Sequence, residues 1–165
     1  MKGAAEVVDK AQVTRLGMLA LLAFALLMAG SYFMASDQGN EMLLVAFPSG
    51  TQVRAEVADT PLMLHAGLAF RDTLPPDWAM LFIFDRADFH RLTTSQYRFP
   101  VDLLWLDEAK RILLIVEGAK PCLEETCPHY GPPPEKARYI LAMNAGFVRK
   151  ERLALGENLR FTLRL

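Results

Sequence analysis

The sequence lacks an excess of positive charge. Its 165 residues include 18 Lys and Arg against 19 Asp and Glu, which gives a formal net charge of −1 at pH 7. Proteins that bind nucleic acid through its phosphates gather Lys and Arg on one face. The balanced charge therefore argues against a nucleic-acid partner.

The sequence also lacks the short motifs that carry catalytic chemistry. It contains no Gly-x-Ser-x-Gly nucleophile motif and no glycine-rich phosphate loop. His90, Ser95 and Asp102 could be written as a catalytic triad, but nothing in their spacing supports that interpretation. Because no nucleophile can be paired with a base, the sequence predicts no catalytic residue and no cofactor. A hydrolase is the least favoured function.

Hydrophobic runs long enough to cross a bilayer are absent, with one exception near the N-terminus. Residues 16–36 contain no charged side chain. About 20 residues at a helical rise of about 1.5 Å cover a hydrocarbon core of about 30 Å. The run therefore predicts a single transmembrane helix in contact with the lipid bilayer.

The charges on either side of this run predict its orientation. Cations precede it and anions follow it, namely Lys2, Lys10 and Arg15 before and Asp37 and Glu41 after. The positive-inside rule then predicts a single-pass protein of a bacterial inner (cytoplasmic) membrane, with its N-terminus in the cytoplasm. We expect a cytoplasmic segment over 1–15, the transmembrane helix over 16–36, a spacer over 37–43 and a periplasmic or otherwise extracytoplasmic domain over 44–165.

A cleaved signal peptide is the alternative interpretation of the same run. Ala29, Gly30 and Ser31 offer a small-x-small cleavage site. The apolar run continues past that site, which favours a retained anchor. Both interpretations export the body of the protein.

The pattern of the body is typical of short strands separated by turns. Thr51–Val57 alternates polar and apolar residues, as a half-buried strand does. Asp59, Thr60 and Pro61 form a helix start, with a capping side chain followed by proline in the first turn. The remaining predicted strands are 78–84, 101–106, 111–116, 139–143 and 158–165, of which 101–106 and 111–116 form a hairpin. These elements predict a mainly β fold, a small barrel-like or curled sheet with one or two short helices.

Only two cysteines are present, Cys122 and Cys127. A close pair in an exported domain usually oxidises, so we expect a disulfide that shapes its loop. Two alternatives remain open. A metal site with His129 would have a Cys-x4-Cys-x-His spacing that matches no strong zinc pattern, and a redox pair would lack the Cys-x-x-Cys spacing.

The body resembles a known family, domain of unknown function 192 (DUF 192), over about residues 44–165. The resemblance is carried by the order and spacing of short stretches: Val57–Pro61, Gly67–Arg71, Met80–Phe84, Pro100–Asp102, Pro121 and Cys122 with Cys127, Pro128 and Tyr130, Arg138–Leu141, Asn144–Gly146 and Gly156. It implies a small β-barrel-type fold that often follows an export signal. Since no activity is established for the family, the resemblance supports a fold more than a function.

The departures from the family pattern concern polar positions. Where members usually carry Trp-Met-Lys-Asn-Thr, this chain has Thr93–Tyr97, and Glu157 replaces an Asp. Ala69 and Ala79 replace a Met and a Gly of the family. A family pocket at this place would therefore be lost or rebuilt here. We interpret four polar residues as structural, namely Asp59, Arg71, Asp102 and Asn144.

These observations favour a non-catalytic, membrane-anchored extracytoplasmic module, an accessory or scaffold subunit that binds other membrane protein subunits. The alternative is a small-ligand-binding envelope domain. Its rim, for interaction or ligand binding, would then include Tyr97, Phe99, His129 and Tyr130.

Overall fold

The computed structural model describes residues 42–162 together with Met18, Leu21 and Phe24. The chain divides into one unit over Met1–Gly39 and another over Asn40–Leu165. Met18, Leu21 and Phe24 are helical, and the rest of the predicted transmembrane helix lies outside the described residues. Within the described part of the chain, no helix is both long enough and apolar enough to cross a bilayer.

The second unit is built mainly of strands, with two short helices. The strands are β1 (Met42–Ala46), β2 (Gln52–Ala58), β3 (Trp78–Asp88), β4 (Leu92–Thr93), β5 (Val101–Leu106), β6 (Ile112–Ala119), β7 (His129–Tyr130) and β8 (Ala137–Asn144), and the helices are α2 (Pro61–Ala66) and α3 (Phe147–Glu151). This content confirms the mainly β prediction, and the hairpin of β5 and β6 forms as expected. The sequence pattern did not predict β1.

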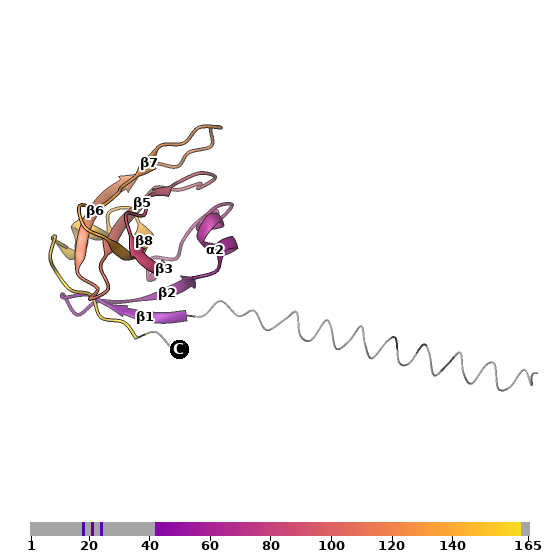
Figure 1. The fold of residues 1–165 in the computed structure, drawn as a ribbon, viewed down its shortest axis with the longest axis horizontal. Helices are drawn as coiled ribbons and strands as arrows, with labels where there is room; N and C mark the ends of the chain where they lie inside the picture. Colours follow the sequence, from indigo (N-terminus) through magenta and orange to yellow (C-terminus); the bar gives the residue numbers. More distant parts are fainter. Residues whose placement is uncertain (1–17, 19–20, 22–23, 25–41, 163–165) are drawn as a thin grey trace, which may run out of the picture. The chain divides into compact units, whose positions relative to one another are not determined.

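Six strands form one sheet in the order β1-β2-β3-β8-β5-β6, and β4 pairs with β7 in a separate ribbon. The pairing of β2 with β3 is parallel and every other pairing in the sheet is antiparallel. A parallel pair needs a crossover connection, and α2 belongs to the chain segment that makes it. Figure 1 shows the sheet curling from β1 and β2 toward β6, with α2 on one side.

The sheet does not close into a barrel, so the barrel-like part of the prediction is wrong. The predicted last strand, 158–165, makes only isolated bridges within its described residues. Ala46 and Arg160 exchange backbone hydrogen bonds of 2.8 and 2.9 Å at the β1 edge. At the other edge, the Gly156 amide donates to Ile112 O at 2.9 Å. The chain after Gly156 therefore crosses from one edge strand to the other instead of running along either.

The two faces of the sheet have separate apolar cores, because successive side chains of a strand point to opposite sides. In β3, Ala79 and Leu81 contribute to one core, whereas Met80 and Phe82 contribute to the other. The first core is completed by residues 147–161, and we name it the C-terminal face. The second is completed by residues 63–74 and 92–99, and we name it the loop face.

Candidate functional site

Three neighbouring segments cover the loop face, and we name them together the loop cover: residues 61–72, 94–98 and 120–130. The Phe70 amide donates to Gln96 O at 3.0 Å, and the Gln96 amide donates to Cys122 O at 2.8 Å. The Cys122 amide donates in turn to Thr94 O at 3.2 Å. Backbone hydrogen bonds thus place the three segments side by side, and Figure 1 shows α2 and the loop around β7 on the same side of the sheet.

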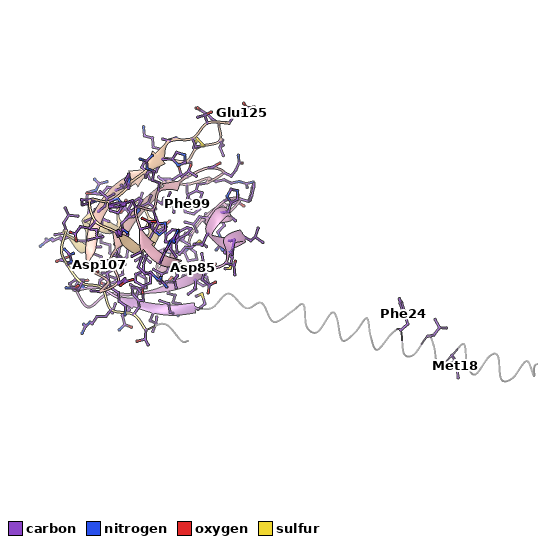
Figure 2. All side chains as sticks on the ribbon, viewed as in Figure 1. Met18, Phe24, Asp85, Phe99, Asp107 and Glu125 are labelled. Atoms are coloured by element: carbon purple, nitrogen blue, oxygen red, sulfur yellow. A yellow bond between two sulfur atoms is a disulfide. The ribbon has the colours of Figure 1, made fainter. Side chains whose placement is uncertain are left out.

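Large apolar side chains are exposed on this cover. Leu62 is 77% exposed, Phe70 is 68% exposed and Leu123 is 67% exposed, and each comes from the first or third segment. Figure 2 shows Glu125 at the outer tip of the third segment, two residues beyond Leu123. Phe70 and Gln96 also adopt positive φ angles of 63° and 60°, which are costly for residues other than glycine.

A buried ion pair lies beneath the cover. Arg71 donates through both Nη atoms to the two carboxylate oxygens of Glu56, at 2.7 and 2.6 Å. The Glu56 side chain is 6% exposed and the Arg71 side chain is 33% exposed. The hydrogen bonds that Arg71 donates to Glu56 are the main reason that the pKa of Arg71 is raised. Arg71 also lines a hollow of about 300 Å³ against α2.

Tyr97 is buried under the same cover, with 2% of its surface exposed. Burial raises the pKa of its phenol above the ordinary value, and a hydrogen bond with the Leu68 backbone opposes that shift. A Cβ at Gly67 would come within 2.5 Å of the Tyr97 hydroxyl, so glycine is required there. The structure therefore places Tyr97 below the surface, where it packs the cover onto the sheet.

The predicted disulfide between Cys122 and Cys127 is confirmed, with a Cα–Cα distance of 5.8 Å. Because both sulfurs are bonded to each other, the alternative metal site with His129 would lack its two thiolates. Among the described residues, no group of three His, Cys, Asp or Glu side chains gathers as metal ligands. The Thr94 hydroxyl donates to Lys120 O at 2.7 Å and ties the start of the disulfide loop to the second segment.

The other predicted rim residues lie on β7 and just before β5. His129 and Tyr130 form β7, opposite Thr93 and Leu92. His129 is exposed and Tyr130 is half-buried. Phe99 lies just beyond the second segment and lines a hollow to which Tyr97, His129 and Tyr130 do not contribute.

Two residues of the formal triad, Asp102 and His90, have other partners. Asp102 is fully buried, and its two oxygens accept backbone hydrogen bonds from Gly118 at 2.8 Å and Val148 at 2.9 Å. The His90 ring stacks on Phe84 with centroids 3.7 Å apart. The Asp102 hydrogen bonds hold β5, β6 and α3 together.

The remaining residues interpreted as structural have different surroundings. Asn144 Nδ2 donates to Leu74 O at 2.8 Å and to Pro75 O at 3.2 Å, which fixes the connection into β3. Asp59 is exposed just before α2, and Thr60 is the residue whose hydroxyl caps the helix by accepting from the Met63 amide at 3.3 Å. Arg71 pairs with Glu56, a residue that the strand pattern places among outward polar positions.

Two further hollows mark the surface. One, of about 510 Å³, is lined by Thr73, Leu74, Pro76, Phe99, Asn144, Ala145, Gly146, Phe147 and Lys150. The other, of about 680 Å³, lies along β1 and residues 160–162. The sequence pattern singled out Phe99 and Asn144. It did not single out Lys150, because this residue is one of several charges in a segment expected to be a solvated helix.

Comparison with known proteins places the fold. The DUF192 family model, described as an uncharacterized ACR, matches residues 44–161. A protein of Sinorhizobium meliloti 1021, provisionally described as a transcription regulator, is 27% identical with a TM-score of 0.64, over 73% of this chain and 92% of that one. A protein of unknown function from Novosphingobium aromaticivorans DSM 12444 is 22% identical with a TM-score of 0.65, over 76% of this chain and 89% of that one.

No curated protein matches the sequence significantly. The family match covers more than half of the chain and includes every strand of the sheet except the first two residues of β1. The chain therefore belongs to the DUF192 family of uncharacterized proteins.

Proposed function

We propose that this chain is a non-catalytic, membrane-tethered module of the bacterial envelope, whose domain docks on the extracytoplasmic part of another membrane protein as an accessory or scaffold subunit. The observation that carries the proposal is the exposure of Leu62, Phe70 and Leu123 on one loop cover. Single exposed apolar side chains are ordinary, but several on adjoining segments are typical of a surface that another protein covers.

The backbone at Phe70 supports a role for this side chain outside the domain. Its φ of 63° costs on the order of 1–3 kcal/mol for a residue other than glycine. With 68% of its surface exposed, the ring gains little from packing within the domain. An aromatic side chain held outward in this way is suited to fill a pocket on a partner, as interface hot spots do.

The chemistry of the cover supports binding rather than catalysis. The Arg71 guanidinium donates two hydrogen bonds to the Glu56 carboxylate. Burial raises the pKa of the Tyr97 phenol further above neutral pH. Polar groups engaged in this way hold the cover in place and leave its apolar side chains as the distinctive surface.

The predicted transmembrane helix supports a partner in the same membrane. A domain tethered to a bilayer meets other proteins of that bilayer at a high effective concentration, so a small docking surface suffices. The nearest competing occupant is a second copy of this chain, and the experiment below separates the two.

The test is affinity purification of the full-length chain from gently solubilised native membranes, followed by intact-mass analysis of everything recovered. We expect an uncleaved chain together with another membrane protein in a fixed ratio. Phe70→Ser combined with Leu123→Ser should lose that protein. Leu155→Ser is the matched control, since Leu155 is 64% exposed but lies outside the loop cover.

Four outcomes would contradict the proposal. Recovery of the chain alone would show that it has no stable partner. Recovery of a chain shortened near Ser31 would show that the N-terminal helix is cleaved and does not tether the domain. Recovery of only a second copy of this chain would make the surface a dimer interface. Equal loss of the partner in the Leu155→Ser control would show that the loop cover is not the docking surface.

A further inference from the structure

We propose that the hollow beside Phe99 binds a small carboxylate with an apolar body, and that Lys150 provides the counter-charge. The hollow has a volume of about 510 Å³, which lies within the range of small-molecule sites. None of its lining residues belongs to the loop cover as defined above. This binding function is therefore additional to the docking role and does not depend on it.

The walls of the hollow are mainly apolar. Leu74 is 5% exposed and Phe147 is 8% exposed, so both present packed surfaces at its base. The half-buried Phe99 and the exposed Pro76 complete the apolar lining. Such walls favour a ligand with an aliphatic or aromatic body, because burying apolar surface provides most of the affinity at sites of this kind.

Hydrogen bonds fix two sides of the hollow to the sheet. The Asn144 amide group donates to Leu74 O and Pro75 O, which holds the β3 connection on one side. The buried Asp102 carboxylate accepts from the Val148 amide, which holds α3 and therefore Lys150 on the other side. A hollow with walls fixed in advance loses little conformational entropy when a ligand binds.

Charge in the hollow comes from one side chain. Lys150 is the only charged residue in its lining. The neighbouring Arg149 is paired with Glu117 at 3.1 Å. The neighbouring Glu151 accepts hydrogen bonds from the Ser49 and Thr51 hydroxyls at 2.6 and 2.7 Å.

Within the described residues, no carboxylate lies within ion-pair distance of the Lys150 ammonium group. Its charge acts at longer range on Glu151, whose pKa is lowered mainly by the Ser49 and Thr51 hydrogen bonds and also by Lys150. One cation beside apolar walls matches a ligand with one negative charge and an apolar body. A doubly charged phosphate would leave one charge without a partner and would gain nothing from Phe99 or Leu74.

The test uses the full-length chain in lipid nanodiscs with 3-phenylpropanoate as the probe, and amide signals of Ala145 and Gly146 as the NMR readout. We expect saturable shifts of those signals, and weaker binding of the neutral 3-phenylpropanamide. Lys150→Gln should weaken binding of the carboxylate about fivefold, the effect of one exposed charge pair, and Lys150→Arg should retain it. Lys136→Gln is the matched control, because Lys136 is an exposed lysine outside the hollow.

The variants at Lys150 change an exposed side chain, so unchanged signals elsewhere in the domain establish that the fold is intact. Shifts that do not saturate would overturn the site. Shifts elsewhere in the domain that leave the signals of the hollow's residues unchanged would overturn it as well. Equal affinity for 3-phenylpropanamide, or unaltered affinity in Lys150→Gln, would overturn the carboxylate assignment. Tighter binding of inorganic phosphate than of 3-phenylpropanoate would overturn the ligand class.

Discussion

The two faces of the sheet are covered in different ways, although they share the same central strands. On the C-terminal face, one continuous stretch, residues 147–161, supplies the cover and buries Phe147, Leu159 and Phe161. On the loop face, three segments distant in sequence meet through backbone hydrogen bonds. That second cover encloses the Arg71–Glu56 ion pair and leaves the Phe70 ring outside.

This difference separates stability from function within one small domain. The continuous cover adds stability through the apolar side chains that it buries on the sheet, while its charged side chains face outward. A cover made of three segments depends on a small number of bonds, and its loops can present side chains outward because the sheet positions them. We therefore expect substitutions on the loop face to affect partner binding as well as stability, and substitutions of the buried apolar residues of the C-terminal face, such as Leu159 and Phe161, to affect stability alone.

The largest expected effect on the loop face comes from Arg71→Met. The change removes the bidentate partner of a carboxylate that is 6% exposed, which costs about 3 kcal/mol of unfolding free energy. Denaturant unfolding followed by circular dichroism measures the loss. In the double variant Glu56→Gln/Arg71→Met, the buried charge is gone and about half of the loss should return. A loss below about 1 kcal/mol in the single variant would mean that the ion pair contributes no more than an exposed one.

Removing the disulfide distinguishes the two covers directly. Cys122→Ser combined with Cys127→Ser opens a ring of six residues, which costs about 2 kcal/mol in the chain-entropy account. Amide hydrogen exchange should accelerate at Gln96, whose amide donates to Cys122 O, and should change least at Leu159 on the C-terminal face. Equal acceleration at both amides would show that the two covers open together and would refute the separation.

The sequence predicted the strands better than it predicted the two covers. Alternation in Thr51–Val57 and the apolar runs of β3 and β5 identify strands because the pattern is local. The same alternation misplaces Glu56, because β2 has a cover on both sides and the polar position is buried there as well. The alternation of residues 158–165 predicted a last strand, yet the path of that segment depends on hydrogen bonds with Ala46 and Lys110, which no local pattern records.

The candidate site was only partly predictable for the same reason. The disulfide follows from two cysteines close in sequence, and it forms as expected. Tyr97 has an aromatic side chain in a polar stretch and resembles a rim residue, but contact with Gly67 places it under the cover. Leu62, Phe70 and Leu123 meet on one cover only through tertiary hydrogen bonds, so their exposure could not be inferred from sequence.

A pH titration of Tyr97 should give a smaller effect. Burial raises the pKa of this phenol in the folded state above the ordinary value of 10.0. Because the pKa of the phenol is higher in the folded state, the contribution of Tyr97 to the free energy of unfolding is complete below about pH 10. That contribution is lost as the pH rises through the pKa of the folded state. Tyr97→Phe should therefore be less stable than the natural chain by about 1 kcal/mol at pH 8, through loss of the Leu68 hydrogen bond, and the gap should narrow at about pH 11. A gap that widens with pH would contradict the burial of the phenol.

The finest comparison uses one left-handed residue from each face. Phe70 and Lys110 have φ angles of 63° and 66°. Lys110 Nζ donates to Phe161 O and lies 4.6 Å from the Phe161 ring centroid, so its side chain offsets the backbone strain. Phe70→Gly relieves similar strain and removes a side chain that is mostly exposed, which should raise stability by about 0.5 kcal/mol. Lys110→Gly should lower stability by about 1 kcal/mol, because its lost contacts outweigh the relief. Thermal unfolding of the two variants measures both changes in stability.

If Phe70→Gly gains stability but loses the membrane partner, then the strain at Phe70 is maintained for binding. If Phe70→Gly loses stability, the ring packs on the domain and the loop face is as closed as the C-terminal face.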